Sequence, residues 1–229
     1  MKNKYLAFIK WLFCITLLVG PFFLKAQTHN LTKTQLQDPP IPVEALFSNN
    51  KLHYQTNVKK TFSPSSRVSF FSLATYTADY KNELSRNRIL IEAQISYTIK
   101  KGFGVMTGTD INSVTGFSAI VGPQHTFASR KILAVTIASF FLNTKRDFKL
   151  FGLYEYKPSI GTGWSLYNRM QFIYNYSLKE GTHNRSYLYL RSGLKKDAFV
   201  FGLGANLDQF GPKKTFEDNY GIFLRWEFR

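Results

Sequence analysis

The residues of this 229-residue chain that could perform acid–base or metal chemistry are few. Its four histidines are His29, His53, His125 and His183, and no two of them have the spacing of metal ligands. We therefore expect no metal site and no cofactor. Glu180, His183 and Ser186 are the residue types of a serine nucleophile that is activated by a histidine and oriented by a carboxylate. Because three such residues often occur within ten positions by chance, we favour a protein without enzymatic activity and assign no catalytic residue.

A second set of charged residues lies at alternate positions of segments that are rich in apolar residues: Glu92, Glu155, Arg169, Arg191, Arg225 and Glu227. A charge in the middle of such a segment is tolerated where it is paired or in contact with water. We therefore expect these six residues to form a polar, ion-paired interior. In that interior the three arginines would lie beside the three glutamates.

The segments that carry these charges are predicted to be β-strands, because their hydrophobic pattern has a period of two residues. The clearest case is the stretch from Ile89 to Lys100, in which apolar and polar residues alternate. Aromatic residues, which favour strands, make up 17% of the chain. Ten strands are expected, at 68–80, 89–100, 103–111, 115–121, 132–142, 148–157, 164–176, 186–194, 199–208 and 220–228.

The last expected strand has the most specific pattern. It places Tyr220, Ile222, Leu224, Trp226 and Phe228 on one face, with Arg225 and Glu227 on the other. This ending resembles the terminal strand of Gram-negative outer-membrane β-barrel proteins, in which an aromatic residue closes an alternating apolar row; here Arg229 follows that residue. The resemblance implies an all-β, transmembrane, antiparallel up-and-down barrel in the outer membrane. Each spanning strand of such a barrel faces lipid on one side and a polar lumen on the other.

The beginning of the chain is typical of an exported protein. Basic residues precede the uncharged run from Trp11 to Leu24, and the small residue Ala26 follows it, which is the pattern of a cleaved secretory signal peptide. Cys14 would permit a lipid anchor, but the bulky residues before it do not fit a lipoprotein signal. We divide the chain into a signal peptide at 1–26, an extended periplasmic segment at 27–50 and a β-barrel at 51–229.

The connections between the expected strands alternate in length. Short ones lie at 100–102, 159–163 and 195–197, and longer ones at 80–88, 177–185 and 209–219. Outer-membrane barrels place short turns in the periplasm and long loops outside. The connection from Gly122 to Lys131 is long for the periplasmic side. Because single-chain bacterial barrels have even strand numbers, we expect ten strands with Leu52 to Phe62 as a lead-in or plug. Twelve strands are the alternative, and a lipocalin-like soluble barrel is a further one.

The chain is strongly basic, with a formal net charge of +16. A nucleic-acid partner is not favoured, because the basic residues lie mostly between strands and no helix-turn-helix or zinc spacing is present. The expected partners are outer-membrane lipids, including an anionic glycolipid, and the outer-membrane assembly machinery, whereas the oligomeric state stays open. The expected glycolipid contacts lie in the external loops: Lys179, Arg185, Lys213 and Lys214.

A barrel of this size has a narrow lumen, since wide aqueous channels need about 16 strands. We therefore expect a structural, binding or assembly-partner barrel with a salt-bridged lumen. A narrow channel or transporter for small solutes is the alternative. An outer-membrane lipid-modifying enzyme is the second alternative.

Overall fold

The computed structural model of the protein describes residues 38–81, 83–113 and 116–228. The predicted signal peptide at 1–26 lies outside these residues. Within them, no helix has the length and hydropathy that would let it cross a membrane. One short 3-10 helix, η2 (Leu84–Arg86), lies between two strands.

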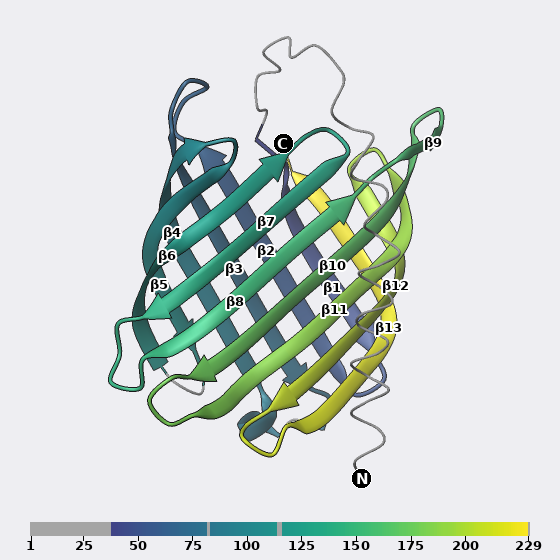
Figure 1. Cartoon of the computed structure of the whole chain (residues 1–229). Coiled ribbons are helices and arrows are strands. Elements are labelled where there is room, and N and C mark those ends of the chain that lie inside the picture. The colour runs from purple at the N-terminus through teal and green to yellow at the C-terminus, as the bar shows by residue number, and fades with distance from the viewer. Residues whose placement is uncertain (1–37, 82, 114–115, 229) are drawn as a thin grey trace, which may run out of the picture. The chain divides into compact units, whose positions relative to one another are not determined.

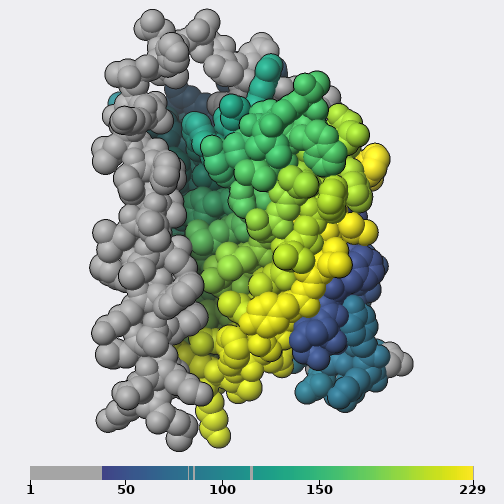
Figure 2. Space-filling model, turned by 90° about the vertical axis from the view of Figure 1, so that its right-hand side faces the viewer, coloured from purple at the N-terminus to yellow at the C-terminus, as the bar shows by residue number. Residues whose placement is uncertain are grey.

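The described chain forms one closed antiparallel β-barrel (Figure 1). Its strands are β1 (Ile41–Ser48), β2 (Lys51–Thr61), β3 (Val68–Asp79), β4 (Arg88–Lys100), β5 (Phe103–Asn112), β6 (Gly116–Ala128), β7 (Ile132–Phe141), β8 (Asp147–Tyr156), β10 (Trp164–Ser177), β11 (Thr182–Lys196), β12 (Phe199–Phe210) and β13 (Thr215–Phe228). The three-residue strand β9 (Ser159–Gly161) only extends the connection before β10. Each strand pairs with its neighbours in sequence, and the pairing of β1 with β13 closes the wall. Figure 2 shows this part of the wall, with β1 in purple beside β13 in yellow.

The expected fold class, an all-β antiparallel up-and-down barrel, is confirmed, but the preferred strand number of ten is wrong. The barrel has twelve strands, which was the alternative. The two additional strands are β1, which lies inside the segment expected to be extended to residue 50, and β2, which was expected to be a lead-in or plug. The long connection expected from Gly122 is also wrong, because β6 continues to Ala128.

The two ends of the barrel can be told apart by the chain termini. The proximal end holds Ile41, Phe228 and the turns at 62–67, 101–102, 129–131, 157–163 and 197–198. The distal end holds the turns at 49–50, 80–87, 142–146, 178–181 and 211–214. The proximal turn between β4 and β5 is formed by Lys101 and Gly102, both with positive φ, the geometry of a tight two-residue hairpin.

The wall has an apolar outer face. On β13 the side chains alternate: Trp226 is 50% exposed, whereas its neighbour Arg225 is 2% exposed. The same alternation leaves Ile91, Ile95 and Val105 exposed on other strands. A soluble barrel would carry its apolar residues inside and polar residues outside, so this alternation supports a wall that faces hydrocarbon.

The interior of the barrel has two different sides. One side is an apolar cluster contributed mainly by β3, β5, β6, β7 and β8, with Leu73, Ile120 and Leu153 fully buried. The other side, formed mainly by β1 and β10 to β13, carries the three buried arginines, Arg169, Arg191 and Arg225, together with Glu44, Asp208 and Glu227. Charges also lie beside the apolar cluster, where the buried Lys149 of β8 contacts Glu92 and Asp110.

Candidate functional site

The charged side chains of the interior form a column that extends from the distal end to the proximal end of the barrel. We call this set the polar column, and it consists of Glu44, Lys51, Glu155, Lys157, Tyr167, Arg169, Arg185, Arg191, Lys195, Asn206, Asp208, Glu217, Arg225 and Glu227. Successive members are joined by hydrogen bonds, lie opposite each other on neighbouring strands or, as Asn206 and Asp208 do, follow each other on the inner face of one strand.

The centre of the polar column is one carboxylate shared by two arginines. Arg169 on β10 and Arg191 on β11 lie directly opposite each other, an arrangement in which two like charges repel. Glu44 of β1 faces both of them. Its Oε2 accepts from Arg169 Nη1 at 2.7 Å and its Oε1 from Arg169 Nη2 at 2.6 Å, while Arg191 Nε donates to Oε1 at 2.8 Å. Glu44 therefore neutralises a repulsive pair that the strand register forces together.

Gly204 makes room for this central group. It lies opposite Arg191 in the ladder between β11 and β12. A Cβ atom at this position would lie 2.8 Å from Leu46 Cδ1 and 3.0 Å from Arg191 Cδ. A larger residue would thus displace the arginine that contacts Glu44.

Closer to the proximal end, Arg225 of β13 holds a second group. Its Nη1 donates to Glu155 at 2.7 Å and to the hydroxyl of Tyr167 at 2.6 Å, and its Nη2 donates to Glu227 at 3.0 Å. Glu155 is also the direct ladder neighbour of Arg169, which links this group to the central one. At the proximal mouth, Lys157 and Lys195 bind Glu227.

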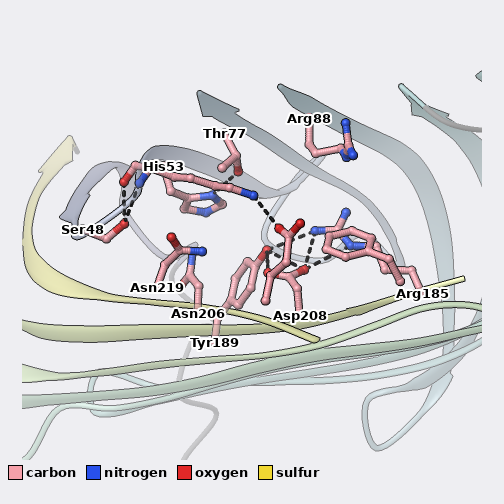
Figure 3. Close-up of a pocket in the computed structure, with 12 residues that line it drawn as sticks. Ser48, His53, Thr77, Arg88, Arg185, Tyr189, Asn206, Asp208 and Asn219 are labelled. Carbon is pink, nitrogen blue, oxygen red and sulfur yellow. Dashed lines mark hydrogen bonds and ion pairs between the residues drawn. The ribbon is translucent and has the colours of Figure 1, made fainter. Parts of the chain in front are cut away.

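The distal mouth contains a small pocket within the polar column (Figure 3). Arg185 Nη2 donates to Asp208 at 2.7 Å, and Tyr189 donates to the same carboxylate at 3.1 Å. His53 and Asn219 line the pocket with His53 Nε2 and Asn219 Oδ1 unpaired within the described chain. The cavity has a volume of about 10 Å³, the space of about one water molecule.

The structure places all six predicted interior residues inside the barrel, each with at most 5% of its surface exposed. Arg225 contacts Glu155 and Glu227, two of the three glutamates expected beside the arginines. Arg169 and Arg191 instead contact Glu44. Glu92 lies apart from the arginines, bound to Lys149 of β8 together with Asp110 of β5.

The partners that sequence reasoning missed are Glu44, Lys149, Asp110 and Asp208. Glu44 lies in a strand that follows Pro39 and Pro40 and contains Pro42, so that the sequence of this segment resembles an extended linker. The signal was nevertheless present, since Val43, Ala45 and Phe47 alternate with Glu44 and Leu46.

The four expected glycolipid residues separate into two groups. Lys179, Lys213 and Lys214 are exposed in the turns at 178–181 and 211–214 of the distal end. Arg185 differs, because its guanidinium points inward to Asp208 and Tyr189. It is therefore poorly placed to contact a lipid outside the barrel.

The histidines form no metal centre within the described residues, where no group of three potential ligands is present. His183 does contact Ser186, with Nε2 3.0 Å from the serine Oγ, but its Nδ1 lies 2.9 Å from the carbonyl oxygen of Gly211. Glu180 forms an ion pair with Lys145. The three residues considered for nucleophilic chemistry are thus not assembled as a triad.

No family model and no curated protein match the chain. Among solved structures, it is similar to a KdgM porin with 9% identity over 82% of this chain and 99% of that chain, at a TM-score of 0.45. It is also similar to the NanC porin, with 10% identity over 82% of this chain and 100% of that chain, at a TM-score of 0.46. The OpdL protein of Pseudomonas aeruginosa matches with 10% identity over 76% of this chain and 66% of that chain, at a TM-score of 0.39. With its closed twelve-stranded wall and its apolar outer face, the chain has the fold of an outer-membrane β-barrel protein.

Proposed function

We propose that this protein is a narrow channel for small anionic solutes and that the polar column is its path. The observation that carries the proposal is the series of charged side chains on one side of the lumen, which continues from one mouth to the other. A charge inside a membrane protein is costly and commonly lines a path for ions or polar solutes. A purely structural barrel could fill its interior with apolar residues, as the cluster on the opposite side does around the single charged group of Lys149, Glu92 and Asp110.

The charge balance of the polar column favours anions. It contains seven basic residues, Lys51, Lys157, Arg169, Arg185, Arg191, Lys195 and Arg225, against five acidic ones, Glu44, Glu155, Asp208, Glu217 and Glu227. Rings or rows of basic side chains select anions in pores. The central group is tightly packed, with Glu44 only 1% exposed, so we expect conduction to require a rearrangement around this residue.

The orientation that fits this function places the proximal end in the periplasm, as the resemblance of the last strand implies. The distal pocket would then be the external entrance. There Arg185 and Lys51 would meet an arriving anion before it reaches the central arginines.

The direct test is the conductance of the purified protein in planar lipid bilayers. We expect small, reproducible current steps and a reversal potential that favours anions under a salt gradient. A complete absence of steps, both in the parent and in a variant with a loosened centre such as Glu44→Gln, would refute the channel.

A closed structural or binding barrel is the second candidate, and the packed apolar cluster around Leu73 and Ile137 supports it. The planar-bilayer recording described above distinguishes the two candidates. A structural barrel remains electrically silent although it is folded and inserted.

A further inference from the structure

Four aromatic rings and one lysine surround a cleft on the outer face of the barrel at its proximal end. The cleft has a volume of about 440 Å³ and is lined by Trp164, Lys196, Asp197, Ala198, Phe199, Phe201 and Trp226. The rings lie close together: Phe199 is 5.7 Å from Phe201 and 6.1 Å from Trp226, and Trp164 is 6.5 Å from Phe201, measured between ring centroids. The four rings therefore form one continuous aromatic row, against which an apolar chain in the cleft would lie.

The cleft opens toward the membrane and not toward the lumen. Val200 and Arg225, which alternate with the cleft residues along β12 and β13, are buried inside the barrel. Phe199 and Trp226 are direct ladder neighbours near the proximal ends of these strands. The cleft therefore lies at the level where the hydrocarbon of the bilayer meets the headgroups, the depth that aromatic side chains favour.

A cation lies at the edge of the cleft. Lys196 Nζ is 5.3 Å from the centroid of the Trp164 ring, and within the described chain no carboxylate forms an ion pair with it. The rest of the proximal rim, from β2 to β7, is also basic, with exposed cations at Lys60, Arg67, Lys100, Lys101, Arg130 and Lys131. Over the described part of this rim, Asp197 is the exposed carboxylate that opposes them.

We propose that the cleft binds one phospholipid with an anionic headgroup. An acyl chain would lie in the cleft against the aromatic rings, and the lipid phosphate would accept a charge-assisted hydrogen bond from Lys196. The two parts of the site match the two parts of such a lipid, because the apolar rings face hydrocarbon while the ammonium group lies at headgroup depth. The net negative headgroup adds attraction from the basic rim.

The proposal requires that the barrel spans the membrane and that its proximal end lies in a phospholipid leaflet. It does not require that the barrel conducts ions. A barrel without measurable conductance would contradict the proposed channel but not the proposed lipid site.

The tryptophans of the chain provide a direct probe. The sequence contains three, Trp11, Trp164 and Trp226, and the last two line the cleft. In a Trp11→Phe background, the intrinsic fluorescence of the barrel reports the cleft alone. Phospholipids with brominated acyl chains quench a tryptophan that they contact.

The barrel is reconstituted in phosphatidylcholine bilayers that contain a small, equal fraction of brominated phosphatidylglycerol or brominated phosphatidylcholine. We expect the brominated anionic lipid to occupy the cleft about fivefold more favourably, the ratio for one lysine near an anionic surface. Lys196→Gln should remove this preference. Lys131→Gln, which removes an equal charge from the same rim away from the cleft, should preserve most of it.

Two results would overturn the proposal. Equal quenching by the two brominated lipids would mean that ordinary bilayer lipid covers the rings without selection. Stronger competition by an anionic glycolipid than by phosphatidylglycerol, when each is added without bromine, would assign the cleft to the other leaflet's lipid.

Discussion

Arg169 and Glu44 form a two-point ion pair across the barrel interior, with N–O distances of 2.6 and 2.7 Å, although they are 125 residues apart in the chain. The pair joins the first strand of the barrel to β10. Arg191 donates to the same carboxylate, so that Glu44 links three strands through one side chain.

Removing the shared carboxylate should destabilise the barrel. In Glu44→Ala, two buried guanidinium groups lose their counter-charge, and breaking a buried pair in this way costs about 3 to 5 kcal/mol. We expect the temperature at which the barrel loses its folded mobility on a detergent gel to fall clearly. Glu83→Ala, which removes an exposed carboxylate at the distal end, is the matched control. If both variants and the parent lose their folded mobility at the same temperature, the central group contributes no stability.

The group around Lys149 should respond to pH when its cation is removed. Lys149 binds Glu92 and Asp110, and all three are buried. In Lys149→Met the two carboxylates face each other without a cation, which should destabilise the barrel strongly at pH 8. Protonation removes their charge, so the stability difference from the parent should shrink as the pH falls toward 5. Unfolding curves at both pH values measure this; a difference that does not depend on pH would contradict it.

A charge introduced on the lipid-facing side of β13 should cost more free energy the closer it lies to the membrane centre. Leu224 and Trp226 are both exposed on the outer wall, at 41% and 50%. An arginine near the membrane centre costs about 2 to 4 kcal/mol and much less near the interface. Leu224→Arg should therefore impair membrane assembly more than Trp226→Arg, which lies nearer the proximal rim. Normal heat-modifiable barrel from both variants would argue against lipid on this face.

The distal lysines remain the proposed contacts for anionic glycolipid. Binding of the purified barrel to glycolipid micelles should weaken with salt and in the combined variant Lys179→Gln, Lys213→Gln and Lys214→Gln. Arg185→Gln should act differently, because Arg185 is bound to Asp208 inside the mouth. We expect it to lower stability and to leave micelle binding nearly unchanged. Unaltered affinity in the triple variant would leave these lysines without the proposed role.

The sequence predicts the strands whose two faces differ most. The segment expected at 89–100 corresponds to β4, which differs from it by a single residue, and the alternation at 220–228 places Arg225 inside and Trp226 outside as expected. Two of the three strand errors, those at β1 and β6, share a physical cause. Pro42 in β1 and Gly122 with Pro123 in β6 are residues that normally mark loops, so these strands were lost or shortened.

Pro123 also coincides with an interruption of the ladder between β6 and β7. The ladder between β6 and β7 pairs Val121 with Phe140 and resumes at Gln124 with Ile137, without pairs at the two positions between them. Proline has no N–H group, so it cannot donate in the ladder. A strand can therefore continue through a residue that interrupts its hydrogen bonding, a possibility that local sequence signals do not show.

The interior contacts were harder to predict than the strands. Alternation reveals that a charge points inward, but not which charge it meets across the lumen. That choice depends on the register of strands that close the barrel, such as the pairing of β1 with β13. Without the strand that carries Glu44, the glutamates that the other expected strands offer to its two arginine partners as counter-charges are Glu92, Glu155 and Glu227.

The most direct test of the proposed channel compares two variants that lose the same charge. Glu44 and Glu92 are both buried carboxylates with 1% exposure, but only Glu44 belongs to the polar column. Glu44→Gln should make the reversal potential in planar bilayers more anion-selective and raise the conductance, because Arg169 and Arg191 lose their shared counter-charge. Glu92→Gln should leave both quantities at the parent value. Identical selectivity in the parent and both variants, or currents that change equally in the two, would contradict a path through the polar column.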